Sequence, residues 1–278
     1  MRQVAPLSVT NVTRVLAVYA QYWRINLLTL LEYRANFALW FGFTFVYHGT
    51  ALAALWVTLA RFPSMNGWDF RQMAFLYALW MTGHAFHNTF FFTVGNVPNM
   101  IREGRFDRFL VRPLDPLFQA LTTPQQIWPD ELLLACVFLG VATWYTHVHV
   151  DAAFLLYVPL VVAGGALIDF GIQLAVATIA FWVVAVDALR WVVMSLEQDF
   201  TRYPISIYSR AVRFILTFVF PFAFMNYFPA SFLLHKTGDA STLSPALGLA
   251  TPLVGLVWFA LSYAFWRIGV DRYQGTGS

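Results

Sequence analysis

Six long apolar stretches follow one another along this chain, which is more apolar surface than a water-soluble fold can bury. A helix needs about 20 apolar residues to cross roughly 30 Å of hydrocarbon. The stretches that meet or approach this length are Ala35–Leu59, Gln72–Gly95, Glu131–His147, Phe154–Val186, Ala211–His235 and Ala246–Trp266. Only 11% of the residues are charged, whereas soluble domains carry about 25%. The sequence therefore predicts an all-α integral membrane protein with six transmembrane helices, forming one membrane domain over residues 35–278.

Two of the six stretches are unusual. The fourth is too long for one crossing, and Pro159 or the pair Gly164–Gly165 is expected to break or kink it, because proline removes a backbone hydrogen bond. The fifth contains two prolines, which predict a span ending near Met225 and a short re-entrant segment over Phe228–Leu234. Non-helical backbone at membrane depth is tolerated only where protein or water shields it.

The distribution of Arg and Lys predicts the orientation, because cytosolic loops carry an excess of both. With the N-terminus in the cytosol, 14 arginines fall in cytosolic segments and only Arg61, Arg71 and Lys236 fall outside. The cytosolic group includes Arg190, Arg202, Arg210 and Arg213. Both termini are therefore predicted to be cytosolic, in a plasma membrane of the bacterial inner-membrane type.

Residues 1–34 are expected to form a cytosolic N-terminus and an amphipathic interfacial helix. At about 100° per residue, most polar residues of Asn11–Arg34 fall on one arc and the aromatic and aliphatic residues fall on another. Such a helix lies in the plane of the membrane interface. The alternative is that this segment only anchors the first span.

The scarcity of lysine and cysteine excludes several kinds of site. The only lysine, Lys236, follows His235, so the chain has no phosphate-binding loop of the Gly-Lys-Ser/Thr type. The motifs HExxH, GxSxG and GxGxxG are also missing from the sequence. Cys136 is the only cysteine, which excludes an intrachain disulfide and a thiolate metal cluster. We expect no enzymatic activity, no cofactor and no nucleic-acid partner for this chain.

A charged segment, Ile101–Gln119 (IREGRFDRFLVRPLDPLFQ), separates the second and third stretches. Within Ile101–Val111, no two oppositely charged residues stand three or four apart, the spacing that pairs charges within a helix. Phe106, Phe109 and Leu110 would form an apolar patch, and Arg112–Pro113 would end the helix. Unpaired charge beside such a patch is typical of a helix that docks a soluble partner. The alternative is a solvated loop whose arginines only fix the orientation.

This segment resembles the signature I..G.LD..L.RPL.P..Q of ABC-2 type permeases, in a branch of uncharacterised export permeases. FTRYPISIYSRAVRF (Phe200–Phe214) and the following FPFAFMNYFPASFLL resemble the pattern F..YP..IY...+R and the proline-rich fifth span of that branch. WRIGVDRY (Trp266–Tyr273) is similar to the family's usual end. The resemblance covers nearly the whole chain. It implies an interfacial N-terminal helix, six spans, a coupling helix at residues 97–113 and re-entrant helices before the last span, as in type V exporters.

Transporters of this family combine two permease subunits with two copies of a separate ATP-binding-cassette ATPase. The resemblance implies that ATP and Mg²⁺ are bound by that ATPase, and that the second permease is identical or homologous to this chain. The ATPase-coupling role then falls on Arg102, Glu103, Gly104, Arg105, Phe106, Asp107, Arg108 and Arg112. Phe106 departs from the family pattern, which has an aliphatic residue at this position.

Asp169 is the one acidic residue that the predicted spans place well inside the membrane. An ionised carboxylate at the bilayer centre costs roughly 2.5–3.5 kcal/mol, so Asp169, with Gln173 one turn later, is a candidate for the substrate pathway. The alternative is that the fourth span begins near Gly165 and that Asp169 is hydrated near the outer surface.

Two histidines of the second span are further pathway candidates. His84 and His87 have the i, i+3 spacing of a metal-binding pair, with His48 or Asp169 as the conceivable third ligand. Intramembrane histidines more often make hydrogen bonds within the packed bundle, so no metal site is predicted.

Taken together, the sequence predicts the membrane-spanning permease subunit of an ABC exporter. Its substrate is expected to be lipophilic or amphipathic, such as a drug-like molecule or a lipid. The alternative is a proton-coupled secondary carrier that uses Asp169 and the intramembrane histidines as a proton relay.

Overall fold

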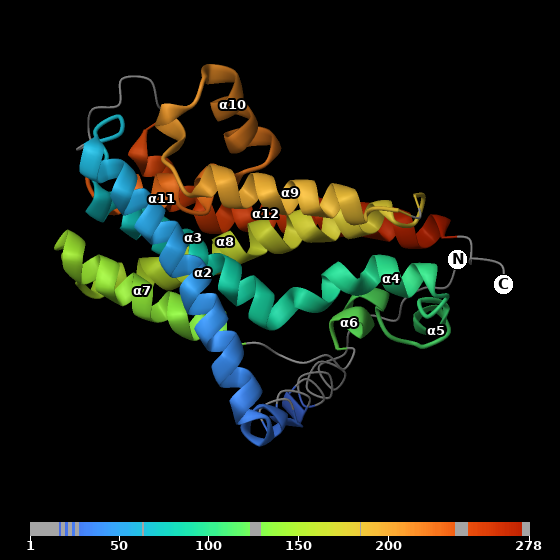
Figure 1. Ribbon diagram of the computed structural model, residues 1–278. Helices are drawn as coiled ribbons and strands as arrows, with labels where there is room; N and C mark the ends of the chain where they lie inside the picture. The colour runs from blue at the N-terminus through green and yellow to red at the C-terminus, as the bar shows by residue number, and fades with distance from the viewer. Residues whose placement is uncertain are drawn as a thin grey trace.

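The computed structural model describes residues 28–62, 64–122, 129–183, 185–236 and 244–273, together with 17, 20, 21, 24 and 25. These residues form a bundle of long helices, and the short helices α4, α5 and α6 gather at one end of it (Figure 1). The long helices are α2 (Arg34–Arg61), α3 (Phe70–Phe91), α7 (Asp130–Thr146), α8 (Ala152–Ile179), α9 (Asp187–Thr201) and α12 (Thr251–Arg272). The shorter ones are η1 (Phe92–Asn96), α4 (Val97–Arg102), α5 (Asp107–Leu110), α6 (Pro116–Leu121), η2 (Ile205–Ile207), α10 (Arg210–Phe214), η3 (Ile215–Val219), η4 (Phe222–Phe224), α11 (Tyr227–Leu233) and η5 (Pro245–Ala250).

Among the described residues, three helices are long and apolar enough to cross a membrane. They are α2, α8 and the continuous stretch Pro245–Arg272, each with 28 residues. A bent pair of helices, Arg210–Val219 and Phe222–Leu233, passes the same test as a fourth. Helix α3 has 22 residues and most of its side chains are buried, so it lies inside the bundle. These helices confirm a multi-pass membrane protein, whereas the number of six spans stays a prediction.

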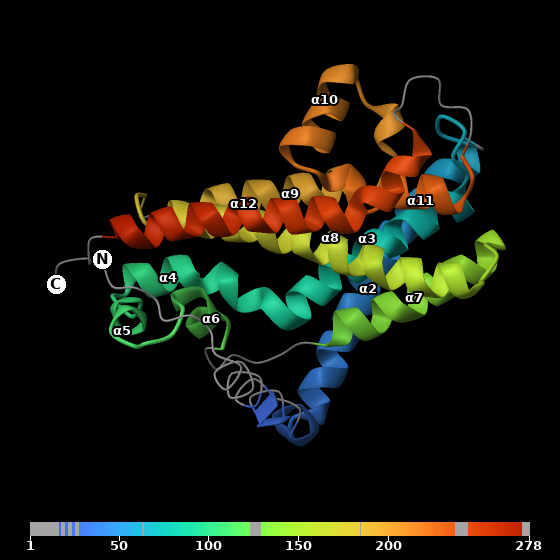
Figure 2. The same cartoon turned by 180° about the vertical axis from the view of Figure 1, so that it is seen from behind.

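Helices α8 and α12 are packed backbone to backbone through glycines. A Cβ at Gly255 of α12 would lie 2.5 Å from the Gly164 carbonyl oxygen and 2.9 Å from its Cα. A Cβ at Gly171 would lie 2.7 Å from the Trp258 ring. Small residues at such contacts let membrane helices approach closely. Both views show α12 running along α8 for most of its length (Figures 1 and 2).

Replacing Gly255 with alanine should therefore destabilise the bundle. The new methyl group meets backbone atoms, which cannot move aside as a side chain would, and overpacking of this kind costs about 1–3 kcal/mol. Gly42→Ala is the matched control, because nothing lies within 4 Å of a Cβ there. Thermal unfolding in detergent should show a lower Tm for Gly255→Ala and no decrease for Gly42→Ala. Equal Tm values would contradict the close contact.

Helix α8 does not break where the sequence predicted. It continues through Pro159 and Gly164–Gly165 from Ala152 to Ile179. The excess length of the predicted fourth span is instead removed at its end, because the helix stops at Ile179 and the chain leaves the helix before Val186. The glycine pair serves close packing against α12 and the residues around Met225, not a kink.

The predicted fifth stretch, Ala211–His235, is bent, as its two prolines indicated. Its residues form two helical segments at an angle of 76°, and the chain turns between them at Phe220 and Pro221. This agrees with the sequence expectation of a proline break, although the break comes before Met225. Helix α11, Tyr227–Leu233, covers the residues expected to be re-entrant.

Helix α9 takes the place along the bundle that the fifth span was expected to fill. It lies beside α8 and α12 in both views (Figures 1 and 2). Its buried side chains are Val193, Glu197 and Thr201, at intervals of four residues. Trp191 and Val192 are exposed on the outside. Helix α9 starts where Asp187 pairs with Arg102 at the end of α4, and the chain that follows it reaches the connection between α2 and α3, where Ser206 accepts from Asn66. The sequence-based placement of this whole segment in one cytosolic loop is therefore wrong.

This change also moves three arginines. Asn66, in the connection between α2 and α3, donates a hydrogen bond to the Ser206 carbonyl at 3.1 Å. Lys236 donates to the Gly67 carbonyl at 2.6 Å in the same connection. The segment after α9 therefore lies at the end of the bundle that the sequence predicted to be outside. The residues that change sides are Arg202, Arg210 and Arg213. The predicted excess of 14 to 3 becomes 11 to 6, and the cytosolic position of both termini stays a prediction.

The predicted interfacial helix Asn11–Arg34 lies largely outside the described residues and stays a prediction.

Candidate functional site

The charged segment between α3 and α7 is folded as two short helices and not as one coupling helix over 97–113. Helix α4 ends at Arg102, and Gly104 then adopts a left-handed conformation with φ 67°. The backbone N–H of Phe106 donates to the Met100 carbonyl at 3.1 Å, which closes the turn before α5 begins at Asp107. Glycine suits position 104 because residues with a side chain are strained at a positive φ. This turn aims Phe106 back into the bundle.

Phe106 is fully buried and is not part of an exposed docking patch, which corrects the sequence-based interpretation. Its ring makes edge-to-face contacts with Phe181, Trp266 and Tyr273, at centroid distances of 5.2, 5.8 and 5.5 Å. These partners come from the segment after α8 and from the end of α12. Phe106 therefore anchors the charged segment to the ends of both helices. Phe109 packs beside Phe106 and is also buried.

The exposed side chains from Arg108 to Leu114 are mainly aliphatic and basic. Leu110, Val111 and Leu114 are exposed, Val111 to 79%. Arg108 and Arg112 are exposed beside them, and no ion pair within 4 Å involves either residue in the part of the chain that the structure describes. The apolar patch available to a partner is therefore shifted four residues along the chain from the predicted one. We call Arg108, Leu110, Val111, Arg112 and Leu114 the docking face.

Other charges of the segment are paired, contrary to the prediction. Arg105 Nε lies 2.5 Å from Glu103 Oε2 across the turn. Arg102 Nη1 donates to Asp187 Oδ2 at 3.2 Å, which joins the end of α4 to the first residue of α9. The spacing rule for helical pairs missed both, because one pair spans two residues of a turn and the other spans 85 residues of sequence. Asp107 is exposed.

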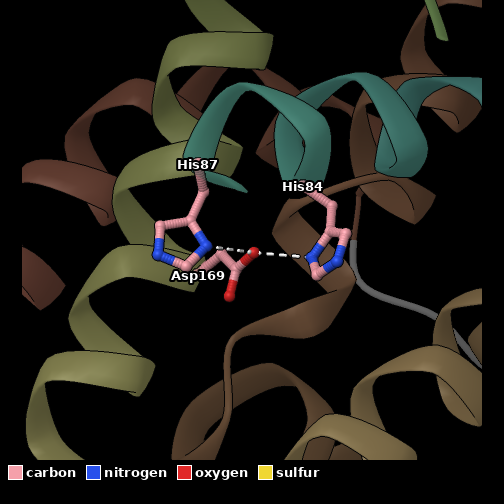
Figure 3. Close-up of side chains that lie close together, drawn as sticks. All are labelled: His84, His87 and Asp169. Carbon is pink, nitrogen blue, oxygen red and sulfur yellow. Dashed lines mark hydrogen bonds and ion pairs between the residues drawn. The ribbon is translucent and has the colours of Figure 1, made fainter. Parts of the chain in front are cut away.

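A second polar site lies inside the bundle, where Asp169 of α8 meets two histidines of α3 (Figure 3). Asp169 Oδ2 lies 2.7 Å from His84 Nδ1 and 3.0 Å from His87 Nδ1. All three residues are buried, and Asp169 is 0% exposed. At 1.5 Å per residue, Asp169 lies about 15 Å from one end of α8 and about 25 Å from the other. The alternative that Asp169 is hydrated near the outer surface is therefore wrong.

Glu197 of α9 completes this site, and the sequence analysis missed it. Glu197 Oε1 lies 3.2 Å from His84 Nδ1 and accepts a hydrogen bond of 3.0 Å from the indole N–H of Trp80. Glu197 is 0% exposed. The sequence feature that could have indicated Glu197 is its position four residues after Val193 and four before Thr201, the other two buried residues of α9. We call His84, His87, Asp169 and Glu197 the histidine–carboxylate cluster.

The cluster continues into a chain of polar contacts that reaches α2 and α7. Asn88 Nδ2 donates to Glu131 Oε2 at 2.9 Å and lies 3.0 Å from His84 Nε2. Glu131 Oε1 lies 3.4 Å from His48 Nε2, and His48 Nδ1 lies 2.7 Å from the Tyr77 hydroxyl. These contacts connect five helices through charged or polar side chains. Gln173 is buried one turn from Asp169 on α8.

The burial of three acidic and three histidine side chains in one network requires charge compensation. An isolated charge is expensive in a low-dielectric interior, so the carboxylates need cationic partners at short range. The structure places a histidine beside each of them. In membrane proteins, such intramembrane ionisable groups mark candidate functional sites.

The apolar multi-helix bundle with its buried charges and its exposed charged segment at one end defines a multi-pass membrane protein. The chain matches the family model described as ABC-2 family transporter protein over residues 45–277. It therefore belongs to the ABC-2 family of transporter proteins, and the resemblance noted in the sequence is confirmed. None of the curated proteins and none of the solved structures matches the chain.

Proposed function

We propose that this chain is the permease subunit of an ATP-driven exporter, and that a separate ATP-binding-cassette ATPase docks on Arg108–Leu114. The observation that carries this proposal is that the docking face is exposed while the same segment is anchored by the buried Phe106. A force applied by a partner at this face is transmitted to α8 and α12 because the anchor fixes the segment to their ends. A solvated loop that only set the orientation would need no such anchor.

A second connection leads from the segment to the interior. Arg102 pairs with Asp187, and Arg190 Nη1 donates to the Gly95 carbonyl at 2.9 Å. These contacts join the first turn of α9 to the last residue of α4 and to η1, which precedes α4. Helix α9 then carries Glu197 into the histidine–carboxylate cluster. We propose that movement of α4 and α5 during the ATPase cycle shifts α9 and changes the packing around this cluster.

The complete transporter would contain two ATPase copies and a second permease, identical or homologous to this chain, in a plasma membrane with both termini in the cytosol. Six spans would then cross the bilayer, with α9 as the fifth. A lipophilic or amphipathic substrate is supported by the aromatic packing between α3, α8 and α12, where Phe170 packs against Phe91 at 4.9 Å and Phe259 at 5.5 Å between ring centroids. Asp169, Gln173, His84 and His87 are the polar candidates for contact with that substrate.

Reconstitution tests the energy source. Proteoliposomes with the permease and its ATPase should move a fluorescent lipid or hydrophobic dye only when ATP is supplied, and a pH gradient without ATP should move none. Asp169→Asn keeps the shape and one acceptor while removing the charge, so ATPase binding should persist while transport falls at least about tenfold. Transport driven by the pH gradient without the ATPase would contradict the proposal. It would support the proton-coupled carrier, which the buried contacts of Asp169 with His84 and His87 keep as the second candidate.

A further inference from the structure

The histidine–carboxylate cluster brings four metal-ligating side chains together from three helices. His84 and His87 come from α3, Asp169 from α8 and Glu197 from α9. The ligand atoms of the two histidines and Asp169 all lie within 4.8 Å of one another, and Glu197 Oε1 lies 3.2 Å from His84 Nδ1. Figure 3 shows both imidazole rings directed at the Asp169 carboxylate. Ligands of a tetrahedral zinc ion about 2.0–2.2 Å from the metal lie about 3.3–3.6 Å apart, so small side-chain rotations suffice to admit an ion.

We propose that His84, His87, Asp169 and Glu197 bind one divalent transition-metal ion, with Zn²⁺ as the ion that fits best. Two imidazole nitrogens and two carboxylate oxygens are ligand types that Zn²⁺ binds, and together they supply its usual four-coordinate tetrahedral shell. Mg²⁺ and Ca²⁺ prefer six or more oxygen ligands, which this cluster does not supply. This inference does not depend on which energy source drives transport.

The charges favour an ion at this position. Two ionised carboxylates and one divalent cation sum to zero, which is the arrangement that an apolar interior tolerates best. Asp169 Oδ1 and Glu197 Oε2 are buried and have no hydrogen-bond partner among the described residues. Buried polar atoms of this kind are uncommon and need an explanation. A bound cation supplies one, because both carboxylates could turn these oxygens toward it.

The surrounding groups resemble a second coordination sphere. Ligating histidines usually have a hydrogen-bond partner for the other ring nitrogen, and Asn88 lies 3.0 Å from His84 Nε2. After a half turn, the Asn88 amide would accept from the Nε2–H that metal binding at Nδ1 requires, and it would then give up its hydrogen bond to Glu131. Trp80 fixes Glu197 by donating to Oε1.

The site is closed and is therefore expected to be structural. Protein ligands fill all four tetrahedral positions, and none of the four residues is more than 6% exposed. Structural zinc sites have complete protein shells, whereas catalytic ones keep one position open. A resident ion would hold α9 against α3 and α8 through bonds that span more than a hundred residues of sequence.

The test is the metal content of the full-length protein, purified in detergent without chelator after growth with Zn²⁺ supplied. We expect close to one Zn²⁺ per chain after extensive dialysis, and less than about a tenth of that in His84→Gln/His87→Gln. His147 and His149 are exposed, so His147→Gln/His149→Gln is the matched control for surface binding and should retain the metal. Growth with Co²⁺ should give the intense visible absorption of tetrahedral Co²⁺ in the wild type and in this control variant, but not in the cluster variant.

A stability measurement on the unaltered chain covers the case in which the cluster variant does not fold. Zn²⁺ added to protein from metal-depleted cells should raise Tm by roughly 5 °C, whereas Mg²⁺ at the same concentration should not. Zinc content no greater than in a folded cluster variant would overturn the proposal. So would a wild-type Tm that is equally insensitive to Zn²⁺ and Mg²⁺.

Discussion

Reversing the charges of Arg108 and Arg112 to glutamate should abolish association with the ATPase. Both side chains are exposed on the docking face and pair with no acid among the described residues, so their charge is available to a partner. Placing like charges against a complementary surface costs several kcal/mol, which corresponds to about 100-fold or more in affinity. Co-purification of the tagged permease with its ATPase would measure the loss, and ATP hydrolysis by the mixture would report the lost coupling.

The controls separate docking from a general effect of charge. Arg61→Glu alters an exposed arginine at the far end of α2 and should leave the association unchanged. Arg105→Glu should have a smaller effect than Arg108→Glu, because Arg105 is already paired with Glu103. If the ATPase co-purified equally with the double variant and the wild type, the docking face would have to lie elsewhere.

Replacing Phe106 with alanine should have the largest effect on stability of any single change in the charged segment. The ring is fully buried among Phe109, Phe181, Trp266 and Tyr273, and truncation of such a side chain typically costs about 3–5 kcal/mol. The variant should therefore show a lower Tm. Because the segment would lose its anchor, bound ATPase should also hydrolyse ATP without driving transport.

Two substitutions make this prediction specific. Phe62→Ala removes an exposed ring and should change Tm little. Phe106→Leu keeps an apolar side chain at the same position, matches the aliphatic residue expected in this family, and should retain most of the coupling. Normal coupling in a folded Phe106→Ala variant would show that the anchor transmits no motion.

The positions of the spans could be predicted from the sequence wherever length and composition alone decide them. The first, fourth and sixth predicted stretches overlap α2, α8 and α12, because a helix that long and that apolar belongs in a bilayer. Helix α9 escaped this test because it has 15 residues, four of them charged. Its inward polar stripe can be recognised only when the side that faces the other helices is known.

The candidate sites could be predicted as residues but not as contacts. Asp169, His84 and His87 were selected because charge inside a membrane is costly, and they lie together. Glu197 was assigned to a cytosolic loop, so its contact with His84 across 113 residues of sequence could not be foreseen. Phe106 was assigned to an exposed patch because its spacing from Phe109 and Leu110 places the three side chains on one face of a helix. Local spacing does not show that Gly104 turns the chain back toward Trp266.

The glycine contact between α8 and α12 has a consequence for how this transporter can move. Backbone atoms of Gly164 and Gly255 interlock so closely that neither helix can slide along the other without a collision. The pair should therefore move as one rigid strut, with Phe106 attached at its end. Opening and closing must then occur around the strut, where α2 has mostly exposed side chains and α9 is held by polar contacts. A disulfide engineered between α8 and α12 should be compatible with transport, whereas one between α2 and α3 should arrest it.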